Sequence, residues 1–594
     1  MKVLLKYLKE HWKLGILALL LAAINQCFSL MDPYITGRMI DQVGNKASAF
    51  NGDYSIFVHA ILPLLGASVG VALVSRIAKN FQDYYTNVVI QKTGARMYTD
   101  GIKHSLELPY EDFEDQRSGE TLGKLQKVRS DSEKFITSFI GIVFQSIVGV
   151  IFVMIYALRV DWRIAPIFVL TVPALGFVSS LLSKKIKKVS KVILGETTAL
   201  AGSTTESLRN IELVKSIGLT HQEISRLNSV TQKILGLELK KVKFIRSLSF
   251  VQGTTVNLLR TSLIFFLYYL VFKNQVTIGQ LMTLMFYSFF IFGPLQELGN
   301  VIATQRETQA SLANFEAIMS RKPEPRPDDP KKLGTVNSLK FDNVIFKHNT
   351  AVTNAVEKTS FEIKAGETIA FVGPSGSGKT TLVKLLVGLY RPVSGTIYYN
   401  GISEKEINVD DLRQQIGFVS QDTQLFSGTI KENLLFVNPN ATDAECLDVL
   451  NKSACQNLLS RADKGINTLI GEGGVKVSGG EKQRLSIARA LLRKPHLMIF
   501  DEATSSLDSI TEEEITKTIR TISGGKEMIT VLIAHRLSTI MHADKIFVLE
   551  KGHVIESGKH EELLSQKGLY FAMWRQQIGE REHHSLKPKS LAVA

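Results

Sequence analysis

"ETIAFVGPSGSGKTTLVKLL" (Glu367–Leu386) is the stretch that decides the fold of the second half of the chain. An apolar strand pattern runs into Gly373-x-x-x-x-Gly378-Lys379-Thr380, and a helical pattern follows. This strand–loop–helix order predicts a P-loop, because the glycines allow backbone N–H groups to wrap phosphate groups. We expect Lys379 to reach the β- and γ-phosphates and the Thr380 hydroxyl to ligate Mg²⁺. The predicted nucleotide-binding residues of the loop are Gly373, Pro374, Ser375, Gly376, Ser377, Gly378, Lys379, Thr380 and Thr381.

A second motif, "LMIFDEATSSLD" (Leu497–Asp508), ends an apolar strand with two carboxylates. Side chains alternate along a strand, so Asp501 and Glu502 can take different roles. On its own, an Asp-Glu pair at a strand end is often only a solvated turn. Downstream of a P-loop, it predicts a Mg²⁺ ligand in Asp501 and a residue that orients or deprotonates the attacking water in Glu502.

A third motif, "GGVKVSGGEKQRLSIARALL" (Gly473–Leu492), opens a helix with two glycines after a serine. The free N–H groups and the dipole at such a helix start can bind phosphate. Since the chain already has a P-loop with its own lysine, the sequence poses the question of whose phosphate this second helix start binds.

The first half of the chain is rich in apolar runs. Crossing a membrane takes roughly 20 apolar residues as a helix. The predicted spans lie near Leu14–Met31, Ile56–Val74, Phe135–Leu158, Ile164–Leu182, Phe250–Phe272 and Ile278–Phe292. A secretory signal peptide at residues 1–30 is the alternative for the first of them, but five further spans favour a transmembrane helix.

The loops between the spans alternate in length and charge. The two long loops, at 75–134 and 183–249, are basic, and by the positive-inside rule we expect them, the N-terminus and the second half of the chain on the cytoplasmic side of the cytoplasmic membrane. A Pro-rich, charged segment predicts a linker at 320–337. The expected organisation is an all-α transmembrane domain of six helices over 1–319, the linker, an α/β nucleotide-binding domain over 338–578 and a disordered tail over 579–594.

Arg260 lies in the middle of a predicted span, where an ionised side chain costs about 2.5–3.5 kcal/mol. It is either a contact for an anionic group of a transported molecule or a residue paired inside the helix bundle, and the sequence leaves both open. The net charge of +14 would also suit a nucleic-acid ligand, but the basic residues lie largely between apolar segments, so no nucleic-acid partner is expected. The three cysteines, Cys27, Cys446 and Cys455, have no metal-ligand spacing.

The three motifs within one domain resemble those of the ATP-binding cassette (ABC) superfamily. Six spans before one cassette resemble its exporters that assemble from two half-transporters, of the lipid flippase and multidrug exporter type. In the membrane half, "LPYEDFEDQRSGETLGKL" (Leu108–Leu125) and "ESLRNIELVKSIG" (Glu206–Gly218) resemble the family's two cytoplasmic coupling regions. The resemblance implies that Gln421 senses Mg²⁺ and the γ-phosphate, that His535 contacts the γ-phosphate, and that Ser506–Asp508 form a loop near the nucleotide.

The resemblance also implies an answer to the question of the third motif. Ser478, Gly479 and Gly480 would cap the nucleotide held by the P-loop of a second chain, so one chain alone would lack a complete site. Because Glu502, Gln421 and His535 are all present, a homodimer is favoured over a pair with another half-transporter.

The sequence departs from the family pattern in three places. His348 stands where the family has a tyrosine that stacks on adenine, the signature motif reads "VSGGE" (Val477–Glu481), and "TLIGEGG" (Thr468–Gly474) lacks two charged groups found in relatives. We expect an imidazole to stack on adenine too. A glutamate beside phosphate is unfavourable unless its carboxylate faces away.

The expected function is ATP-driven efflux of a lipid, lipid-linked or amphipathic molecule by alternating access, with ATP and Mg²⁺ as cofactors. The alternatives are a peptide or drug exporter that forms half of a heterodimer, and an ATP-gated channel, for which Glu502 would be superfluous. A soluble cassette ATPase acting on DNA or ribosomes shares the motifs, but the six spans exclude it.

Overall fold

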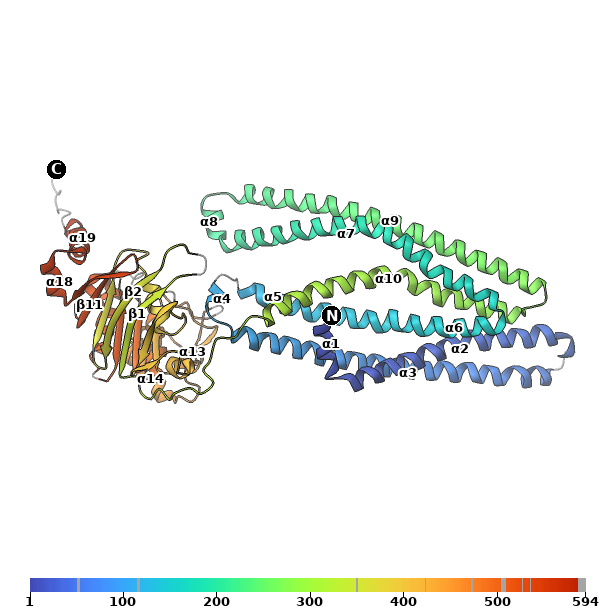
Figure 1. Cartoon of the computed structure of the whole chain (residues 1–594), viewed down its shortest axis with the longest axis horizontal. Helices are drawn as coiled ribbons and strands as arrows, with labels where there is room; N and C mark the ends of the chain where they lie inside the picture. Colours follow the sequence, from blue (N-terminus) through green and yellow to red (C-terminus); the bar gives the residue numbers. More distant parts are fainter. Residues whose placement is uncertain are drawn as a thin grey trace. The chain divides into compact units, whose positions relative to one another are not determined.

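In a computed structural model of the protein (Figure 1), the chain divides into two compact units. Unit 1 comprises Met1–Glu107 and Arg117–Arg321, and unit 2 comprises Leu108–Gln116 and Lys322–Ala594. The structure describes residues 1–50, 54–114, 118–348, 351–421, 423–471, 474–503, 509–525, 527–534 and 536–585. Only the backbone is described for residues 45–50, 114, 118–120, 170–184, 187, 194, 198, 292, 294–296, 298–299, 509–511 and 578–585.

In its described part, unit 1 is helical throughout, and most of its helices are far longer than a bilayer requires. The long helical stretches are α2 (Trp12–Phe50), α3 (Tyr54–Leu106), α5 (Ser118–Ser138) continued by the π-helical turn η1 (Phe139–Phe144) and α6 (Gln145–Val160), α7 (Ala165–Arg209), α9 (Thr220–Phe272) and α10 (Ile278–Met319). The short helical elements are α1 (Lys2–Lys9), η2 (Trp162–Ile164) and α8 (Ile211–Ser216). Figure 1 shows α7 and α9 running side by side and joined through α8.

The predicted spans lie within these helices. Among the described residues, four stretches are long and apolar enough to cross a membrane, namely Trp12–Gly44, Tyr54–Leu106, Thr121–Val160 and Thr220–Phe272. The stretch Ile278–Ile291 in α10 is apolar but shorter, and most of the predicted span at 164–182 falls on α7 residues whose side chains are not described. The helices extend beyond the apolar stretches because a continuous helix satisfies its own backbone hydrogen bonds in lipid and in water alike.

The contact between α2 and α10 is unusually close. A Cβ atom on Gly279 would lie 2.0 Å from the carbonyl oxygen of Gly37, so only glycine fits there. Beside this contact, the Asp41 carboxylate accepts hydrogen bonds from the Gly279 N–H (2.8 Å) and the Thr277 hydroxyl (2.7 Å). Small residues allow helix backbones to approach closely inside a membrane, so this contact joins the first and last spans.

Unit 2 is an α/β domain built on two sheets. The main sheet has the order β12-β11-β3-β10-β9-β6, with β12 antiparallel and the other strands parallel, and the second sheet has the antiparallel order β2-β1-β4-β5. The strands of the two sheets are β1 (Ser338–Phe346), β2 (Val356–Lys364), β3 (Thr368–Val372), β4 (Ser394–Tyr399), β5 (Ile402–Ser403), β6 (Ile416–Val419), β9 (Leu497–Asp501), β10 (Ile529–Ile533), β11 (Lys545–Glu550) and β12 (His553–Gly558). A short ribbon pairs β7 (Gly428–Thr429) with β8 (Leu469–Ile470).

Unit 2 also contains helices. They are α4 (Glu111–Glu114), α11 (Lys379–Leu386), α12 (Val409–Gln414), α13 (Ile430–Leu435), α14 (Asp443–Lys452), α15 (Gln456–Ser460), α16 (Gly479–Leu492), α17 (Ser509–Ser523), α18 (His560–Gln566) and α19 (Leu569–Ser585), with 3₁₀ turns η3 (Gly465–Asn467) and η4 (Leu537–Thr539). Of these helices, α16 packs against β6 and α11 against β9. Central strands are buried on both faces, as parallel sheets usually are. In β3, Ile369 and Phe371 join the core under the second sheet, while Ala370 and Val372 join the core under α17.

The predicted fold class, a helical transmembrane domain followed by an α/β P-loop domain, is confirmed. The predicted tail is described only to Ser585, where α19 ends, and its remainder lies outside the described residues.

Candidate functional site: a nucleotide pocket in unit 2

The P-loop connects the central strand β3 to the start of α11. Two of its glycines are required by close backbone contacts: a Cβ atom on Gly373 (φ +154°) would lie 2.1 Å from the Leu549 carbonyl oxygen, and one on Gly378 (φ +102°) would lie 2.2 Å from the Ala355 carbonyl oxygen. Both backbone angles are also unfavourable for other residues. Gly378 is the N-cap of α11, so the first N–H groups of that helix point into the loop.

Lys379 is buried beneath this loop. Its ammonium group donates hydrogen bonds to the carbonyl oxygens of Gly373 (3.0 Å) and Pro374 (3.1 Å). Burial lowers the pKa of Lys379, and the nearby carboxylates of Glu502 and Asp501 oppose that shift. These contacts hold the lysine's positive charge inside the loop that is predicted to wrap phosphate.

Asp501 ends the buried strand β9. Burial, reinforced by the charge of Glu502, raises the pKa of Asp501 to about 6, and its Oδ1 atom has no hydrogen-bond partner among the described residues. A buried carboxylate oxygen without a partner suits a cation. The Thr380 hydroxyl and the Gln421 amide, which line the cavity described below, are also oxygen donors of the kind that Mg²⁺ prefers.

Glu502 follows at the turn that leaves β9. Its backbone has φ +48°, which is uncommon for a residue other than glycine, and its N–H donates to the Ile533 carbonyl oxygen at 2.9 Å. Here the turn brings the Glu502 side chain into the nucleotide pocket.

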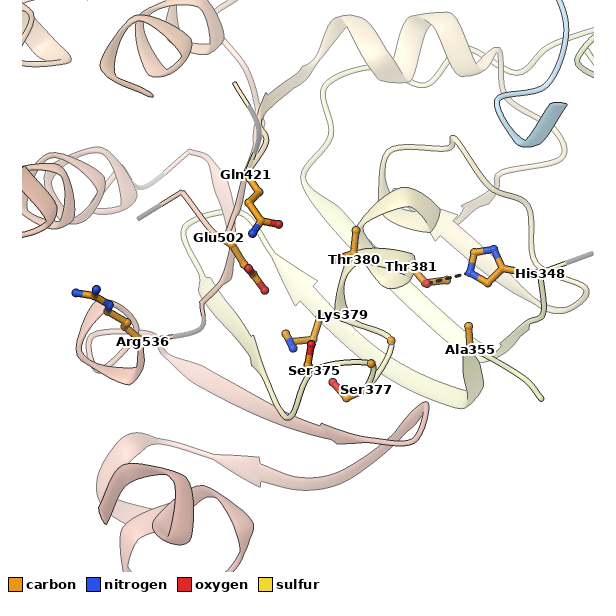
Figure 2. A pocket seen from close by; sticks show the side chains of 12 residues that line it. His348, Ala355, Ser375, Ser377, Lys379, Thr380, Thr381, Gln421, Glu502 and Arg536 are labelled. Atoms are coloured by element: carbon orange, nitrogen blue, oxygen red, sulfur yellow. Dashed lines mark hydrogen bonds between the residues drawn. The ribbon is translucent and has the colours of Figure 1, made fainter. Parts of the chain in front are cut away.

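Residues from the P-loop, Gln421 and Glu502 line one cavity of about 740 Å³ (Figure 2). In Figure 2, Glu502 and Gln421 point toward the side of the cavity where Lys379 and Ser375 lie, and His348 lies at the other end, next to Thr381. The cavity is lined by His348, Ala355, Ser375, Gly376, Ser377, Gly378, Lys379, Thr380, Thr381, Gln421, Glu502 and Arg536. The structure therefore brings most of the predicted nucleotide-binding and catalytic residues to one cavity, whereas Asp501, the residue before Glu502, is not among those that line it.

His348 is positioned by aromatic side chains. Its ring meets those of Phe346 (5.1 Å) and Tyr390 (5.4 Å) edge-on, and its Nε2 lies 3.4 Å from the Thr381 hydroxyl. Phe346 in turn stacks on Tyr390, with ring centroids 4.6 Å apart. The imidazole thus lies at the end of the cavity away from Lys379, where a flat ring can accept a nucleotide base.

Residues that the sequence did not single out surround this pocket. Arg536 lines it and forms an ion pair with the buried Glu512 of α17. Tyr110, from the first predicted coupling region, packs against the domain core with its ring 6.0 Å from that of Tyr390, and the Lys384 ammonium lies 5.2 Å from each ring centroid. Arg536 could have been suspected because it follows His535, but nothing in the sequence pairs Tyr110 with Tyr390.

The signature motif lies outside the lining of this cavity. Ser478 is the N-cap of α16, and Gly479 and Gly480 are its first two residues. Two other predicted site residues, His535 and Asp508, lie outside the described residues, as do Glu472 and Gly473 of the "TLIGEGG" stretch.

In unit 1, Arg260 of α9 contacts two side chains that are themselves exposed, Asn257 and Phe289. Its Nη2 donates to the Asn257 Oδ1 atom (2.9 Å), and its guanidinium lies 4.7 Å from the centroid of the Phe289 ring on α10. No carboxylate among the described residues lies within ion-pair distance of it. The charge of Arg260 is thus held by an amide and an aromatic face.

Comparison with known proteins assigns both halves of the chain. The ABC transporter transmembrane region matches residues 16–295, and the ABC transporter domain matches residues 356–505. An uncharacterized ABC transporter ATP-binding protein from Bacillus subtilis is 30% identical over 96% of this chain and 93% of that protein. The chain belongs to the ABC transporter family.

Two further relatives indicate the branch of the family. An ATP-dependent lipid A-core flippase from Alcanivorax borkumensis is 28% identical over 98% of this chain and 97% of that protein. The structure of a bacterial Atm1-family ABC exporter with ATP bound superposes with a TM-score of 0.84 at 26% identity, covering 95% of this chain and 99% of the other. The protein is therefore an ABC exporter, a membrane protein that binds and hydrolyses ATP to drive export.

Proposed function

We propose that two copies of this ABC exporter share two ATP sites, each made of one chain's pocket and the other chain's signature helix. The observation that carries the proposal is that one pocket gathers Lys379, Gln421 and Glu502, while Ser478 and its helix start do not line it. A phosphate held by the P-loop keeps a face open to a second helix N-terminus. ABC half-transporters generally dimerise, and the set of hydrolytic residues in this chain favours a homodimer over a pair with a different half-transporter.

Within such a site, each side chain has a distinct task. Lys379 and the loop N–H groups would hold the phosphates, and His348 would stack on the adenine. Thr380, Gln421 and Asp501 would hold Mg²⁺, which neutralises phosphate charge when bound. Glu502 would orient the attacking water or accept its proton. His535, which lies outside the described residues, would contact the γ-phosphate. Asp508, in the predicted loop near the nucleotide, would lie close to the shared site.

Closure of two such sites would turn the membrane halves outward, and hydrolysis would reset them, which is alternating access. The basic long loops support a cytoplasmic position for the N-terminus and unit 2, at the cytoplasmic membrane. In this orientation ATP would reach the pocket from the cytosol.

The first test is to purify the chain expressed alone, reconstitute it in lipid nanodiscs and measure ATP hydrolysis beside a Glu502→Gln control. We expect turnover in the wild-type protein and a loss of at least 100-fold in the control, because that variant loses its general base. Absence of turnover in well-folded wild-type protein would contradict the homodimer and indicate a partner half-transporter.

We propose a lipid, lipid-linked or amphipathic substrate with an anionic group near Arg260. Its guanidinium, bound to the Asn257 amide and the Phe289 ring, retains charge that a phosphate or carboxylate of the substrate could neutralise, and the adjacent ring offers apolar contact. An amphipathic drug or a peptide would contact the Phe289 ring more than the Arg260 guanidinium.

Transport of fluorescent anionic and zwitterionic phospholipids in proteoliposomes would test this proposal. We expect Arg260→Gln to slow export of the anionic lipid at least fivefold more than that of the zwitterionic one, and Arg260→Lys to retain much of the difference. Equal slowing of both lipids would assign Arg260 to packing of the bundle and favour the drug or peptide alternative.

A further inference from the structure

The signature helix of this exporter carries an acidic residue near its start, where a negative charge would repel the phosphates of a bound ATP. Glu481 is the third residue of α16, the helix whose start we propose faces the partner's ATP. A carboxylate near a helix N-terminus stabilises the helix but repels a phosphate bound at the same place. The inference below rests on that proposed function.

The structure shows how this carboxylate is held. Its Oε2 atom accepts a hydrogen bond from the Ser478 N–H (2.9 Å), and the Ser478 hydroxyl accepts one from the Glu481 N–H (3.3 Å), which completes a capping box. The other oxygen, Oε1, forms an ion pair with Nη2 of Arg461. Both oxygens of the carboxylate are therefore engaged by the protein itself.

Glu481 is ionised in this arrangement. Burial opposes ionisation, but the Ser478 N–H and the Arg461 guanidinium outweigh it and hold the pKa of Glu481 below its ordinary value. The Glu481 side chain is only 11% exposed, so water screens its charge poorly, whereas that of Arg461 is 53% exposed. Arg461, the residue at the end of α15, is thus the cation that balances a poorly hydrated anion.

We infer that Arg461 is a positioning residue for ATP hydrolysis, which neutralises Glu481 and so allows the signature helix to accept the nucleotide of the partner chain. Arg461 itself does not line the nucleotide pocket of its own chain. Its effect on catalysis acts through the charge of Glu481.

A double-mutant cycle in nanodiscs tests this inference, with the KM for ATP and kcat as readouts. We expect Arg461→Ala to raise the KM for ATP about tenfold, because an uncompensated carboxylate then faces the incoming phosphates. Glu481→Gln should stay near wild type, since a glutamine oxygen can still accept the Ser478 N–H. The double variant should then match Glu481→Gln, because Arg461 is needed only while residue 481 is charged.

A structural role for Arg461 predicts a different pattern. If Arg461 only supported the fold, the double variant would be as impaired as Arg461→Ala, and that result would overturn the inference. A matched control is Lys494→Ala, which breaks the exposed pair with Glu445 and should leave the KM unchanged.

Ser478→Arg separates failure of this inference from failure of the proposed function. A steric block at the N-cap of α16 should abolish hydrolysis if the signature helix contacts ATP. If Ser478→Arg hydrolyses ATP normally, the shared site itself is wrong. If Ser478→Arg is inactive while Arg461→Ala behaves as wild type, the shared site stands and the role of Arg461 is refuted.

Discussion

Asp501 carries a buried carboxyl group whose ionised form is disfavoured by folding. Its raised pKa, about 6 against an ordinary 3.8, means that folding disfavours its ionised form. The cost is therefore fully present above pH 6, declines as the pH falls through the folded pKa, and is absent below pH 4. Ionised Asp501 is therefore destabilising, and its Oδ1 atom has no hydrogen-bond partner among the described residues.

Asp501→Asn should accordingly stabilise the nucleotide-free exporter at pH 8, by about 2–3 kcal/mol, because it removes a buried charge and keeps the shape. Thermal unfolding of the full chain in detergent at pH 8 and at pH 4.5 measures this effect. The gain should be smaller at the lower pH, because Asp501 is then protonated in the folded protein although it is still largely ionised in the unfolded chain. An equal gain at both values would mean that the charge is not its cause.

Most of the site residues that could be predicted belong to motifs whose members are neighbours in the sequence. Gly373 and Gly378 belong to a loop whose pattern dictates its own shape, so the pocket around Lys379 could be predicted. The pairs Arg461–Glu481 and Arg536–Glu512 could not, because each joins two segments whose proximity depends on the whole domain. The roles assigned to His535 and Asp508 stay predictions, since both lie outside the described residues.

At the scale of elements, the joint between α2 and α10 depends on the absence of side chains. A methyl group at Gly279 would lie 2.0 Å from the Gly37 carbonyl oxygen and 2.6 Å from the Asp41 carboxylate, so the two helices would have to separate. Gly279→Ala should lower the Tm of the membrane unit by about 5–10 °C, as core overpacking does. Gly66→Ala on α3 is the control, because its Cβ would meet nothing within 4 Å and alanine favours helix. Equal Tm values for the two variants would refute the close contact.

A second contact between elements connects the segment Leu108–Gln116 to the end of the pocket where His348 lies. The Lys384 ammonium of α11 lies 5.2 Å from the ring centroids of both Tyr110 and Tyr390 and donates a hydrogen bond to the Tyr390 hydroxyl (3.2 Å). Tyr390 stacks on Phe346, which contacts His348. A cation–π contact contributes about 0.5–2 kcal/mol, so Lys384→Met should raise the KM for ATP about two- to fivefold and change kcat little. Steady-state kinetics measures both constants, with Lys331→Met, which breaks an exposed pair with Glu406, as control. A fall in kcat at constant KM would place Lys384 in the chemistry instead.

These two contacts show which features of the helices could not be predicted from the sequence. Apolar length predicted where helices cross the membrane, because the bilayer sets that length, but it predicted neither how far α3 and α9 extend nor that α2 meets α10 at two glycines. A glycine in an apolar helix has the same appearance whether it is packed or exposed, as Gly279 and Gly66 show.

At the scale of the whole molecule, the question is whether two incomplete chains make complete sites. A Lys379→Ala chain has a defective P-loop and an intact signature helix, and a Ser478→Arg chain has the reverse. Each should be inactive as a homodimer. A mixed dimer would contain one site with both parts intact, so co-expression should restore about a quarter of wild-type hydrolysis if chains mix at random and sites act independently. Purification through two different affinity tags, one on each chain, isolates the mixed dimer for the assay. If the mixed dimer is as inactive as its parents, either each pocket uses the signature helix of its own chain or hydrolysis requires both sites to be intact.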